Sequence, residues 1–347
     1  MDKVFFRNSD VAIINSKSNL FYFSGLDNED AAIVLTSDKK FYITDPRNIE
    51  TARDTVKDFE FVVTNSKNYL LDAASLCKNL NKTKIGFEDV TIKHIDYTIL
   101  QDALKEQDLI PMSHRISEIR SVKSESEIAC IVKAQEITDK VYSEIIEYIK
   151  PGMTEIQVAS QLNSKIYAYG GSLAFDSIVS FGRNTSKPHS TPGDNVLNKI
   201  DVVLLDFGAK YKGYCSDMSR SFAVGRIDPQ YKKTYETVIG AQNAVLSRLS
   251  VNMTGGECDE IGRGYFKNFN VDKHFTHSLG HGVGIDIHEV PSLSTKSQDV
   301  MLPGTVVTIE PGLYYEGTFG VRIEDMVRFE NNGVYNLTKS DKSLIII

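Results

Sequence analysis

Residues His277–Glu289 read HSLGHGVGIDIHE and bring together three histidines, three glycines and two acids. The whole chain has only seven histidines, so three of them fall within this one short stretch. On a regular helix His277, His281 and His288 would share one face, but the intervening glycines favour a loop or a strand. Glycine has no Cβ atom, so backbone and ligand can come close to His281. The stretch therefore predicts a binding site around histidine side chains.

Two acidic residues flank a turn-like segment in LLDFGAKYKGYCSDMSRSF, residues 204–222. Asp206 ends an apolar run, and Asp217 follows eleven residues later. The intervening KYKG is typical of a hairpin turn. In an antiparallel hairpin this odd separation can place the two residues directly opposite each other, with Cβ atoms about 4.5–5.5 Å apart. Two carboxylates that close repel, so one pKa rises unless a cation lies between them.

A second acidic pair lies in TVVTIEPGLYYEGTFGVRIEDMVRF, residues 305–329. Glu310 ends an apolar run, and Glu324 lies in a second strand-like segment beyond a glycine-bearing loop. An acid at the end of a buried strand is costly unless it is paired or bound to metal. Each acid could instead cap a strand or pair with a nearby arginine such as Arg220 or Arg322. With the histidine stretch, the four carboxylates favour a site for two divalent cations.

The composition excludes several classes of partner. The chain has 347 residues, of which 41% are hydrophobic and 24% charged, and this length suggests two domains. A net charge of −7 argues against a nucleic-acid partner, and no apolar run is long enough to span a membrane. The N-terminus lacks the pattern of a signal peptide, and the four cysteines show no CxxC spacing. We therefore expect reduced thiols and a cytoplasmic protein.

The pattern of strand-like and helix-like segments changes near residue 118. Before it, short β-rich runs alternate with segments of helical spacing, which predicts a small α/β domain at residues 1–117. The joint RSVKSESEI, residues 120–128, then carries a capping box formed by Ser124 and Glu127. A long amphipathic helix follows and ends at Pro151-Gly152. Residues 118–347 are predicted to form the second domain.

The second domain shows an internal repeat of elements. Met153-Thr154 and Met253-Thr254 are 100 residues apart, and each pair follows a long helical segment. Each pair also precedes another helical stretch and then strand-like segments. This repeated order favours a duplicated α+β half.

These segments together resemble the metallopeptidases of the pita-bread fold, the family that includes methionine aminopeptidase, aminopeptidase P and prolidase. Five segments resemble family motifs and occur in family order: GRNTSKPHSTPGD, LLDFGAKYKGYCSDMSRSF, HSLGHGVGIDIHEVP, TIEPGLY and VRIED. The resemblance covers residues 115–347, and the preceding residues resemble the smaller N-terminal domain of prolidases and aminopeptidases P. It implies an α/β N-terminal domain and an α+β pita-bread (creatinase/aminopeptidase-like) catalytic domain with pseudo-twofold duplicated halves.

The resemblance also implies roles for individual positions. The implied metal ligands are Asp206, Asp217, His281, Glu310 and Glu324. Asp217 and Glu324 would bridge two metals, Asp206 would complete one site, and His281 with Glu310 would complete the other. The implied catalytic residues are His189, His277, His288, Glu310 and Arg322. The implied substrate-binding residues are His189, His288, Tyr314 and Arg322. Ser219 stands where many relatives have threonine, and it retains the hydroxyl group.

The implied activity is metal-dependent hydrolysis of an amino-terminal Xaa-Pro bond in a small peptide with proline at the second position. Two divalent metal ions are implied, with manganese (Mn²⁺) favoured over cobalt, zinc or iron, and so is a homodimer. The sequence leaves open whether the enzyme is a dipeptidase or acts on longer peptides as aminopeptidase P does. Two other interpretations stay open: a peptidase like methionine aminopeptidase, which does not need Arg322, and a metal-free binding module on the same fold.

Overall fold

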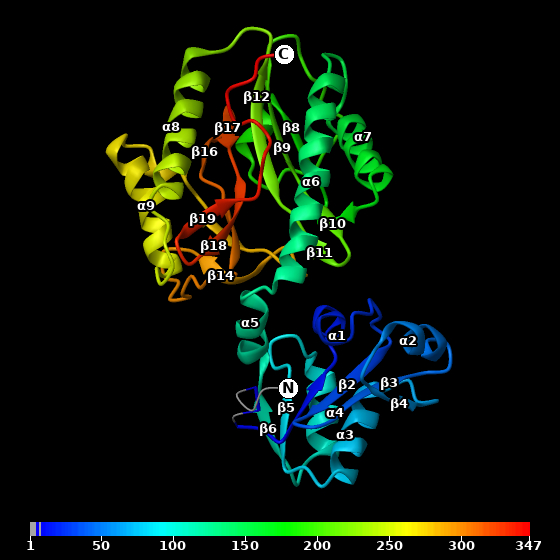
Figure 1. Ribbon diagram of the computed structural model, residues 1–347. Coiled ribbons are helices and arrows are strands. Elements are labelled where there is room, and N and C mark those ends of the chain that lie inside the picture. Colours follow the sequence, from blue (N-terminus) through cyan, green and yellow to red (C-terminus); the bar gives the residue numbers. More distant parts are fainter. Residues whose placement is uncertain (1–4, 7) are drawn as a thin grey trace. The chain divides into compact units, whose positions relative to one another are not determined.

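The computed structural model describes residues 5, 6 and 8–347. The chain divides into two compact units, Met1–Ile119 and Arg120–Ile347 (Figure 1). The division falls within α5 (Ser113–Ser121), and so does the boundary between residues 117 and 118 expected from the sequence. We call Arg120–Ile347 the catalytic unit, because the acids and histidines singled out above belong to it.

The first unit is an α/β sandwich built on a six-stranded sheet of order β4-β3-β2-β1-β5-β6. Its elements are β1 (Val11–Ile14), α1 (Lys17–Ser24), β2 (Ala31–Thr36), β3 (Lys40–Thr44), α2 (Ile49–Thr55), β4 (Glu60–Val63), α3 (Tyr69–Asn79), β5 (Lys84–Phe87), α4 (His94–Ala103) and β6 (Asp108–Pro111). The strand pairs β1–β2 and β2–β3 are antiparallel, and the other neighbours are parallel.

Both faces of this sheet are covered, which explains the continuous apolar runs of its strands. Successive side chains of a strand point to opposite faces. Val11 and Ile13 accordingly join the core that contains residues of α3 and α4, and Ala12 and Ile14 join the core that contains Leu20 of α1. The predicted α/β character of this unit is confirmed.

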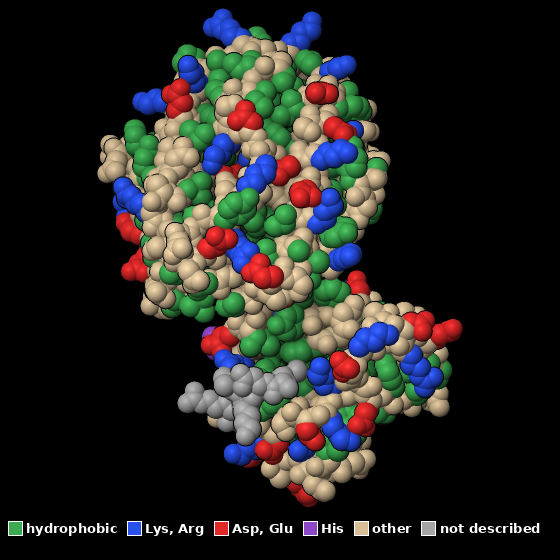
Figure 2. All heavy atoms as spheres, in the orientation of Figure 1, with side chains coloured by type: hydrophobic (Ala, Val, Ile, Leu, Met, Phe, Trp, Pro, Cys, Tyr) green, Lys and Arg blue, Asp and Glu red, His purple; other side chains and the backbone are tan. Residues whose placement is uncertain are grey.

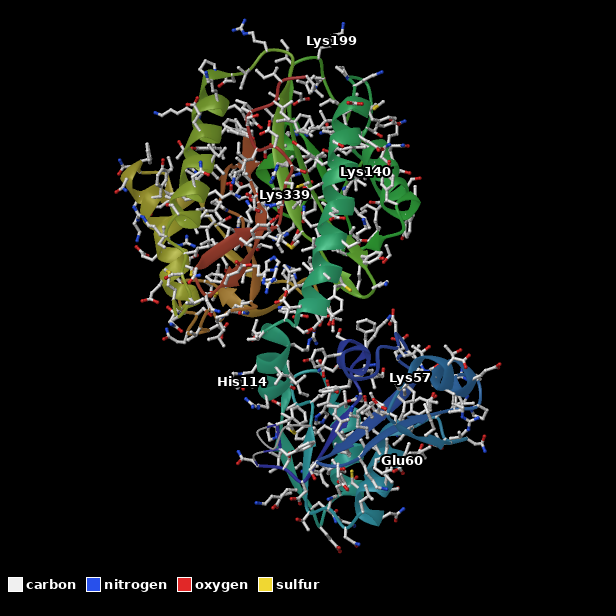
Figure 3. All side chains as sticks on the ribbon, in the orientation of Figure 1. Lys57, Glu60, His114, Lys140, Lys199 and Lys339 are labelled. Atoms are coloured by element: carbon white, nitrogen blue, oxygen red, sulfur yellow. The ribbon has the colours of Figure 1, made fainter. Side chains whose placement is uncertain are left out.

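The first half of the catalytic unit begins with the two predicted helices. Its elements are α6 (Glu125–Tyr148), α7 (Glu155–Ala168), β7 (Ser172–Leu173), β8 (Ile178–Phe181), the 3₁₀ helix η1 (Gly182–Ser186), β9 (Asp201–Phe207), β10 (Ala209–Tyr211), β11 (Tyr214–Cys215) and β12 (Met218–Val224). The capping box predicted at Ser124 and Glu127 is present. Ile145 of α6 and Leu162 of α7 share a buried core with Leu205 of β9. Figure 3 labels Lys140 on α6. Its Nζ lies 3.9 Å from the centroid of the Tyr169 ring.

The second half repeats this plan. Its elements are α8 (Pro229–Leu246), α9 (Gly255–Asn268), the 3₁₀ helix η2 (Asp272–His274), β13 (Gly280–Gly282), β14 (Glu289–Leu293), β15 (Val306–Ile309), β16 (Gly312–Tyr315), β17 (Phe319–Arg322), β18 (Asp325–Glu330) and β19 (Gly333–Asn336). A five-stranded sheet of order β14-β13-β15-β18-β19 carries most of these strands. Val245 of α8 and Phe266 of α9 share a buried core with Val307 of β15.

The two halves share local features as well as the same order of elements. Capping boxes begin α7 at Thr154 and α9 at Thr254. Thr154 forms an isolated antiparallel bridge with Val196, and Thr254 forms one with Val300. Figure 1 shows the α6–α7 and α8–α9 pairs flanking the strands of the catalytic unit. The duplicated pita-bread architecture expected from the sequence is confirmed.

The surface of the described residues is mixed in character. On the face of the catalytic unit seen in Figure 2, the Lys and Arg side chains are interspersed with those of Asp and Glu. Within residues 5, 6 and 8–347, every helix is too short or too polar to cross a lipid bilayer.

Candidate metal centre

The first acidic pair is held by the β9–β12 ladder. Asp206 lies on β9 opposite Ser219, and Asp217 directly precedes β12. The β10–β11 hairpin continues the same register around the turn Lys212-Gly213, where both residues have positive φ. Asp217 therefore lies opposite Gly208, two residues from the position facing Asp206. The two acids are diagonal neighbours on one face. The directly opposed arrangement that their spacing allows does not occur, because the tight turn fixes another register.

The second acidic pair lies at a junction between two ladders. Ile309 pairs with Asp325 in the β15–β18 ladder, and Gly312 pairs with Arg322 in the β16–β17 ladder. Both ladders keep one register, which places Glu310 opposite Glu324 in the gap between them. The two segments that carry these acids are thus neighbours, as the sequence suggested.

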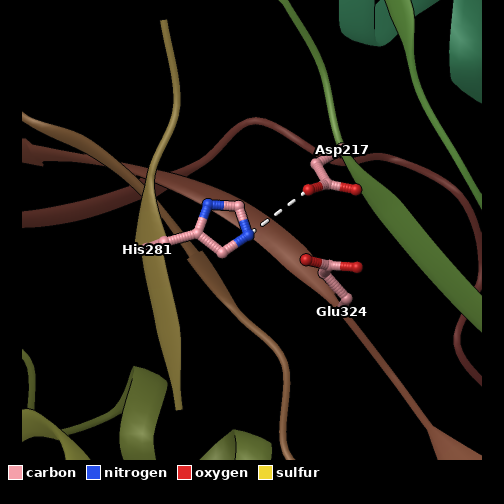
Figure 4. A group of neighbouring side chains, drawn as sticks. All are labelled: Asp217, His281 and Glu324. Carbon is pink, nitrogen blue, oxygen red and sulfur yellow. Dashed lines mark ion pairs between the residues drawn. The ribbon is translucent and has the colours of Figure 1, made fainter. Parts of the chain in front are cut away.

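His281 lies at the centre of β13, and its ring faces the acids. Its Nε2 lies 3.5 Å from Asp217 Oδ2 and 3.4 Å from Glu310 Oε1. Figure 4 shows the ring directed toward the carboxylates of Asp217 and Glu324. The other ring nitrogen, Nδ1, lies 3.1 Å from the carbonyl oxygen of Gly282 and donates to it. This hydrogen bond leaves the lone pair of Nε2 free for a metal, the usual arrangement for a ligating histidine.

The glycines around His281 are needed because other backbone is very close. A Cβ atom at Gly280 would lie 2.0 Å from the carbonyl oxygen of Thr308, and one at Gly282 would lie 2.5 Å from that of Val290. The backbone N–H of His281 also donates to Thr308 Oγ1 at 3.1 Å. Of the loop or strand expected from these glycines, the structure has a short strand at Gly280–Gly282, and its pairing with β15 directs the imidazole toward the acids.

Burial makes the acidic cluster electrostatically unfavourable without a cation. Asp217 is 4% exposed and Glu324 is 2% exposed. Burial raises the pKa of Asp217 and of Glu324 well above the ordinary values, and the negative charges of the neighbouring acids raise them further. Burial raises the pKa of Glu310 to about 8. A divalent cation would offset this repulsion and allow all of these groups to ionise.

The unpaired oxygen atoms of the cluster fit a metal. Asp206 Oδ1 and Asp217 Oδ1 are buried and have no hydrogen-bond partner among the described residues. Donor atoms of Asp217, His281 and Glu324 all lie within 4.8 Å of one another. Carboxylate oxygens with one imidazole suit manganese, iron, cobalt or zinc. The residues present therefore fit a divalent metal centre.

A cavity of about 310 Å³ opens onto the cluster. The expected site residues that line it are His189, Asp206, Asp217, His277, His281, His288, Glu310, Arg322 and Glu324. Burial lowers the pKa of His277 to about 3 and of His281 to about 4, and it also lowers the pKa of His288. These three imidazoles are therefore neutral near pH 7 in the metal-free protein. The structure brings the predicted acids and histidines together in one place.

Tyr314, the remaining expected residue, lies behind this lining. Its hydroxyl accepts a hydrogen bond from Arg322 Nη1 at 2.7 Å and lies 3.0 Å from His277 Nε2. His277 Nδ1 lies 2.8 Å from the carbonyl oxygen of Ser278 and donates to it. Nε2 of the neutral ring must then accept, so the Tyr314 hydroxyl donates to it. Arg322 and Tyr314 thus set the tautomer and orientation of His277.

Sequence reasoning missed the structural role of Ser219. Its hydroxyl donates to Glu324 Oε2 at 2.7 Å and accepts from Arg322 Nε, also at 2.7 Å. Ser219 therefore joins the second acidic pair to the arginine. The signal was its spacing: in a strand, the residue two positions after Asp217 points to the same face.

Comparison with known proteins shows the family of the chain. The profile of metallopeptidase family M24 matches residues 129–331, and that of the creatinase/prolidase N-terminal domain matches residues 7–122. The chain belongs to metallopeptidase family M24. The first-named match lies within the catalytic unit, and the other covers most of the first unit.

Individual relatives are similar over most of their length. An Xaa-Pro dipeptidase of Pyrococcus furiosus is 38% identical over 231 residues, which is 66% of each chain. The solved structure of an Xaa-Pro dipeptidase from Bacillus anthracis superposes with a TM-score of 0.95 at 33% identity, covering 99% of this chain and 98% of that one. That of an X-Pro aminopeptidase from Thermotoga maritima gives 0.91 at 29% identity and covers 98% of both chains.

Proposed function

We propose that the chain hydrolyses the amino-terminal Xaa-Pro bond of small peptides with the help of two divalent cations. The observation that carries this proposal is the group of four carboxylates that line one cavity with His281, two of them with an oxygen that lacks a partner among the described residues. The preference for proline is supported by the dipeptidase and aminopeptidase named above, which are similar to this chain over both units.

Five residues would hold the cations: Asp206, Asp217, His281, Glu310 and Glu324. We assign Asp217 and Glu324 as bridging ligands, Asp206 to one site, and His281 with Glu310 to the other. Manganese is our proposed metal, because oxygen donors dominate the set. Bound cations would lower the pKa of water and polarise the carbonyl group of the scissile bond.

His189 and His288 act on the substrate in this proposal, whereas the N–H group of His277 is already donated to the Ser278 carbonyl. His189, His277 and His288 line the same cavity as the acids. A neutral imidazole can donate one N–H group to an oxyanion that develops on the scissile carbonyl. His288 is assigned this role, because its ring centroid lies 4.3 Å from that of His281 and it therefore borders the metal ligands. His189 is assigned to substrate binding.

Glu310 is proposed to carry a proton from the attacking water to the imino nitrogen of the leaving proline. Its Oε1 lies 3.4 Å from His281 Nε2, and its Oε2 lies 3.9 Å from His277 Nδ1. A carboxylate in this position borders both the metal ligands and the substrate histidines. The proton would be held on Oε2, because Thr308 Oγ1 donates to Oε1 at 3.3 Å.

The decisive experiment compares two dipeptides on one preparation. The purified chain is stripped with a chelator, reloaded with manganese, and assayed with Ala-Pro and Ala-Ala. We expect cleavage of Ala-Pro alone and loss of activity after stripping. Equal cleavage of both, or of neither, would reject proline specificity. Metal content measured on the same sample tests the metal-free binding module, and release of methionine from Met-Gly-Met tests the methionine aminopeptidase alternative.

Substrate length and assembly need separate measurements. We favour a dipeptidase, and comparing Ala-Pro with Ala-Pro-Gly-Gly distinguishes it from an enzyme of the aminopeptidase P type. We further propose a homodimer, which light scattering at micromolar concentration would detect. A cytoplasmic location also stays a prediction. It agrees with the four free cysteines, of which Cys77, Cys215 and Cys258 are buried.

A further inference from the structure

A second buried charge cluster lies beside the metal centre, at the joint motif RSVK. Arg120 and Lys123 of this motif both approach Glu289, the residue that follows His288. The side chains of Arg120, Glu289 and Lys123 are 10%, 7% and 1% exposed. Burial of charged groups is costly, so a cluster of this kind persists only when its members are paired. The proposed reaction assigns no role to any of them.

Glu289 is the hub of this cluster. Its Oε1 accepts hydrogen bonds from Arg120 Nη2 and, at 3.0 Å, from the backbone N–H of Asp286. Its Oε2 lies 3.5 Å from Lys123 Nζ, an ammonium nitrogen that has no hydrogen-bond partner among the described residues. Arg120 Nη2 also donates to Asp286 Oδ2 at 2.9 Å. One guanidinium therefore holds both acids that flank His288.

The loop of residues 284–289 is fitted closely around the Glu289 carboxylate. A Cβ atom at Gly284 would lie 2.5 Å from Glu289 Oε2, so a side chain there would displace the carboxylate from this position. The same loop receives a hydrogen bond at 2.7 Å from the Cys215 N–H to the Gly284 carbonyl. Lys210 Nζ donates to the Ile285 carbonyl at 2.9 Å. Hydrogen bonds from Cys215 and Lys210 thus hold the backbone of this loop.

His288 depends on this fastening for its direction. Glu289 begins β14, and His288 is the last residue of the bend that precedes this strand. His288 lines the substrate cavity, whereas the Glu289 carboxylate lies against Arg120. The contacts that fix Glu289 on one side of the chain therefore also fix the direction of the His288 imidazole on the other side.

We propose that Arg120 and Lys123 are positioning residues for His288, acting through Glu289 and Asp286. This inference rests on the proposed function only where it concerns the rate of hydrolysis. It assigns the joint motif to the substrate side of the cavity and not to the metal ligands. Loss of the anchor misplaces an oxyanion donor, and a misplacement of about 1 Å can cost roughly 10²-fold in rate.

The test replaces Arg120 by methionine, which keeps a long side chain and removes the charge. Hydrogen exchange followed by mass spectrometry reports the backbone of residues 283–293, and kcat for Ala-Pro reports catalysis. We expect faster exchange in this peptide, a kcat lower by about 10²-fold, and unchanged manganese affinity. Arg120→Lys keeps the positive charge without the planar fork, so its effects should be smaller.

A double variant separates positioning from a general loss of structure. If Arg120 acts through His288, then Arg120→Met combined with His288→Ala should be no slower than His288→Ala alone. Losses that multiply would overturn the proposal, as would unchanged exchange in residues 283–293. Lys165→Met is the matched control: it breaks the 2.5 Å ion pair with Glu144 within the same unit, at residues outside the cavity lining. It should leave kcat unchanged.

A milder variant covers the case in which Arg120→Met fails to fold. The Asp286 side chain is 45% exposed, so Asp286→Asn removes one partner of Arg120 near the surface. Faster exchange in the same peptide supports the anchor, and unchanged exchange overturns it. Exchange does not depend on activity. A wild-type protein that cleaves neither dipeptide would therefore count against the proposed function, while the exchange data would still decide the anchoring.

Discussion

Arg322 Nη2 lies 2.5 Å from Asp206 Oδ2, and the arginine is only 2% exposed. Its Nε donates to Ser219, and its Nη1 donates to the Tyr314 hydroxyl and, at 3.3 Å, to the Pro188 carbonyl. These contacts engage four of the five N–H donors of a guanidinium. A guanidinium in this cavity could orient Asp206 or bind the C-terminus of the peptide, and these contacts favour the orientation of Asp206.

Arg322→Ala is expected to lower kcat for Ala-Pro by about 10–100-fold, the usual cost of losing a group that orients a metal ligand. At saturating manganese the variant should still bind two ions, because all five proposed ligands remain. Steady-state kinetics and metal content measured on the same sample check both statements.

Amidation of the substrate tests whether Arg322 binds the C-terminus of the peptide. Ala-Pro amide should be slower than Ala-Pro by the same factor in the wild type and in Arg322→Ala. A clearly smaller factor in the variant would show that Arg322 binds the C-terminal carboxylate of the peptide. Arg328→Ala is a matched control, since this arginine pairs instead with Glu125, whose side chain is 78% exposed.

Asp217→Asn is expected to abolish both metal binding and activity. Asp217 is proposed to give one carboxylate oxygen to each cation, and an amide offers a single neutral oxygen. Its Oδ2 already lies 3.5 Å from His281 Nε2, and its Oδ1 has no partner among the described residues. Metal titration followed by calorimetry checks this. A variant that binds two ions with wild-type affinity would refute the bridging role.

Local chemistry made much of the fold and the site predictable. Apolar runs, capping boxes and glycine turns depend on neighbouring residues, so α6, α7 and the β10–β11 hairpin could be read directly. The resemblance then placed acids and histidines that are distant in sequence into one site. The repeated Met-Thr pair pointed to the duplication, which the bridges at Thr154 and Thr254 now display.

Register and long-range partners could not be predicted in the same way. The spacing of Asp206 and Asp217 allowed opposition, but the turn at Lys212-Gly213 fixes a register shifted by two residues. Arg120 meets Glu289 across 169 residues of sequence, and no local pattern specifies that contact. Tertiary packing alone decides such pairs.

The metal-free protein should become less stable as the pH rises from 6.5 to 8. Burial raises the pKa of Glu310 to about 8, above its ordinary value of 4.5. A raised pKa contributes stability that is present at low pH and is lost as the pH rises through the folded-state value. His277 and His281 have the opposite effect, since their pKa values are lowered from 6.5 to about 3 and about 4. Their destabilising contribution is confined to pH values below about 6.5.

Calorimetry of chelator-treated protein at several pH values in this window checks the sign. One proton changes the free energy of unfolding by at most about 1.4 kcal/mol per pH unit. Glu310→Gln should flatten the dependence, and added manganese should raise Tm more at pH 8 than at pH 6.5. A metal-free Tm that increased across the window would contradict the assigned burial of the acids.

His281 and His288 should respond differently to metal, although their ring centroids are only 4.3 Å apart. His281 Nε2 faces Asp217 and Glu310, and its Nδ1 is held by the Gly282 carbonyl, as expected of a metal ligand. His288 lines the cavity within the loop that Arg120 and Glu289 anchor. His281→Ala should therefore lower manganese affinity, and excess manganese should partly restore its activity.

His288→Ala should bind manganese like the wild type and lose about 10²–10³-fold in kcat, the usual cost of removing an oxyanion donor. Excess manganese should not restore this loss, because the coordination sphere is intact. Titrating both metal-free variants with manganese while recording kcat separates the two roles. Rescue of His288→Ala with no rescue of His281→Ala would show that the assignments are reversed. A common dependence in both variants would indicate that the two rings, which meet edge to face, act as one unit.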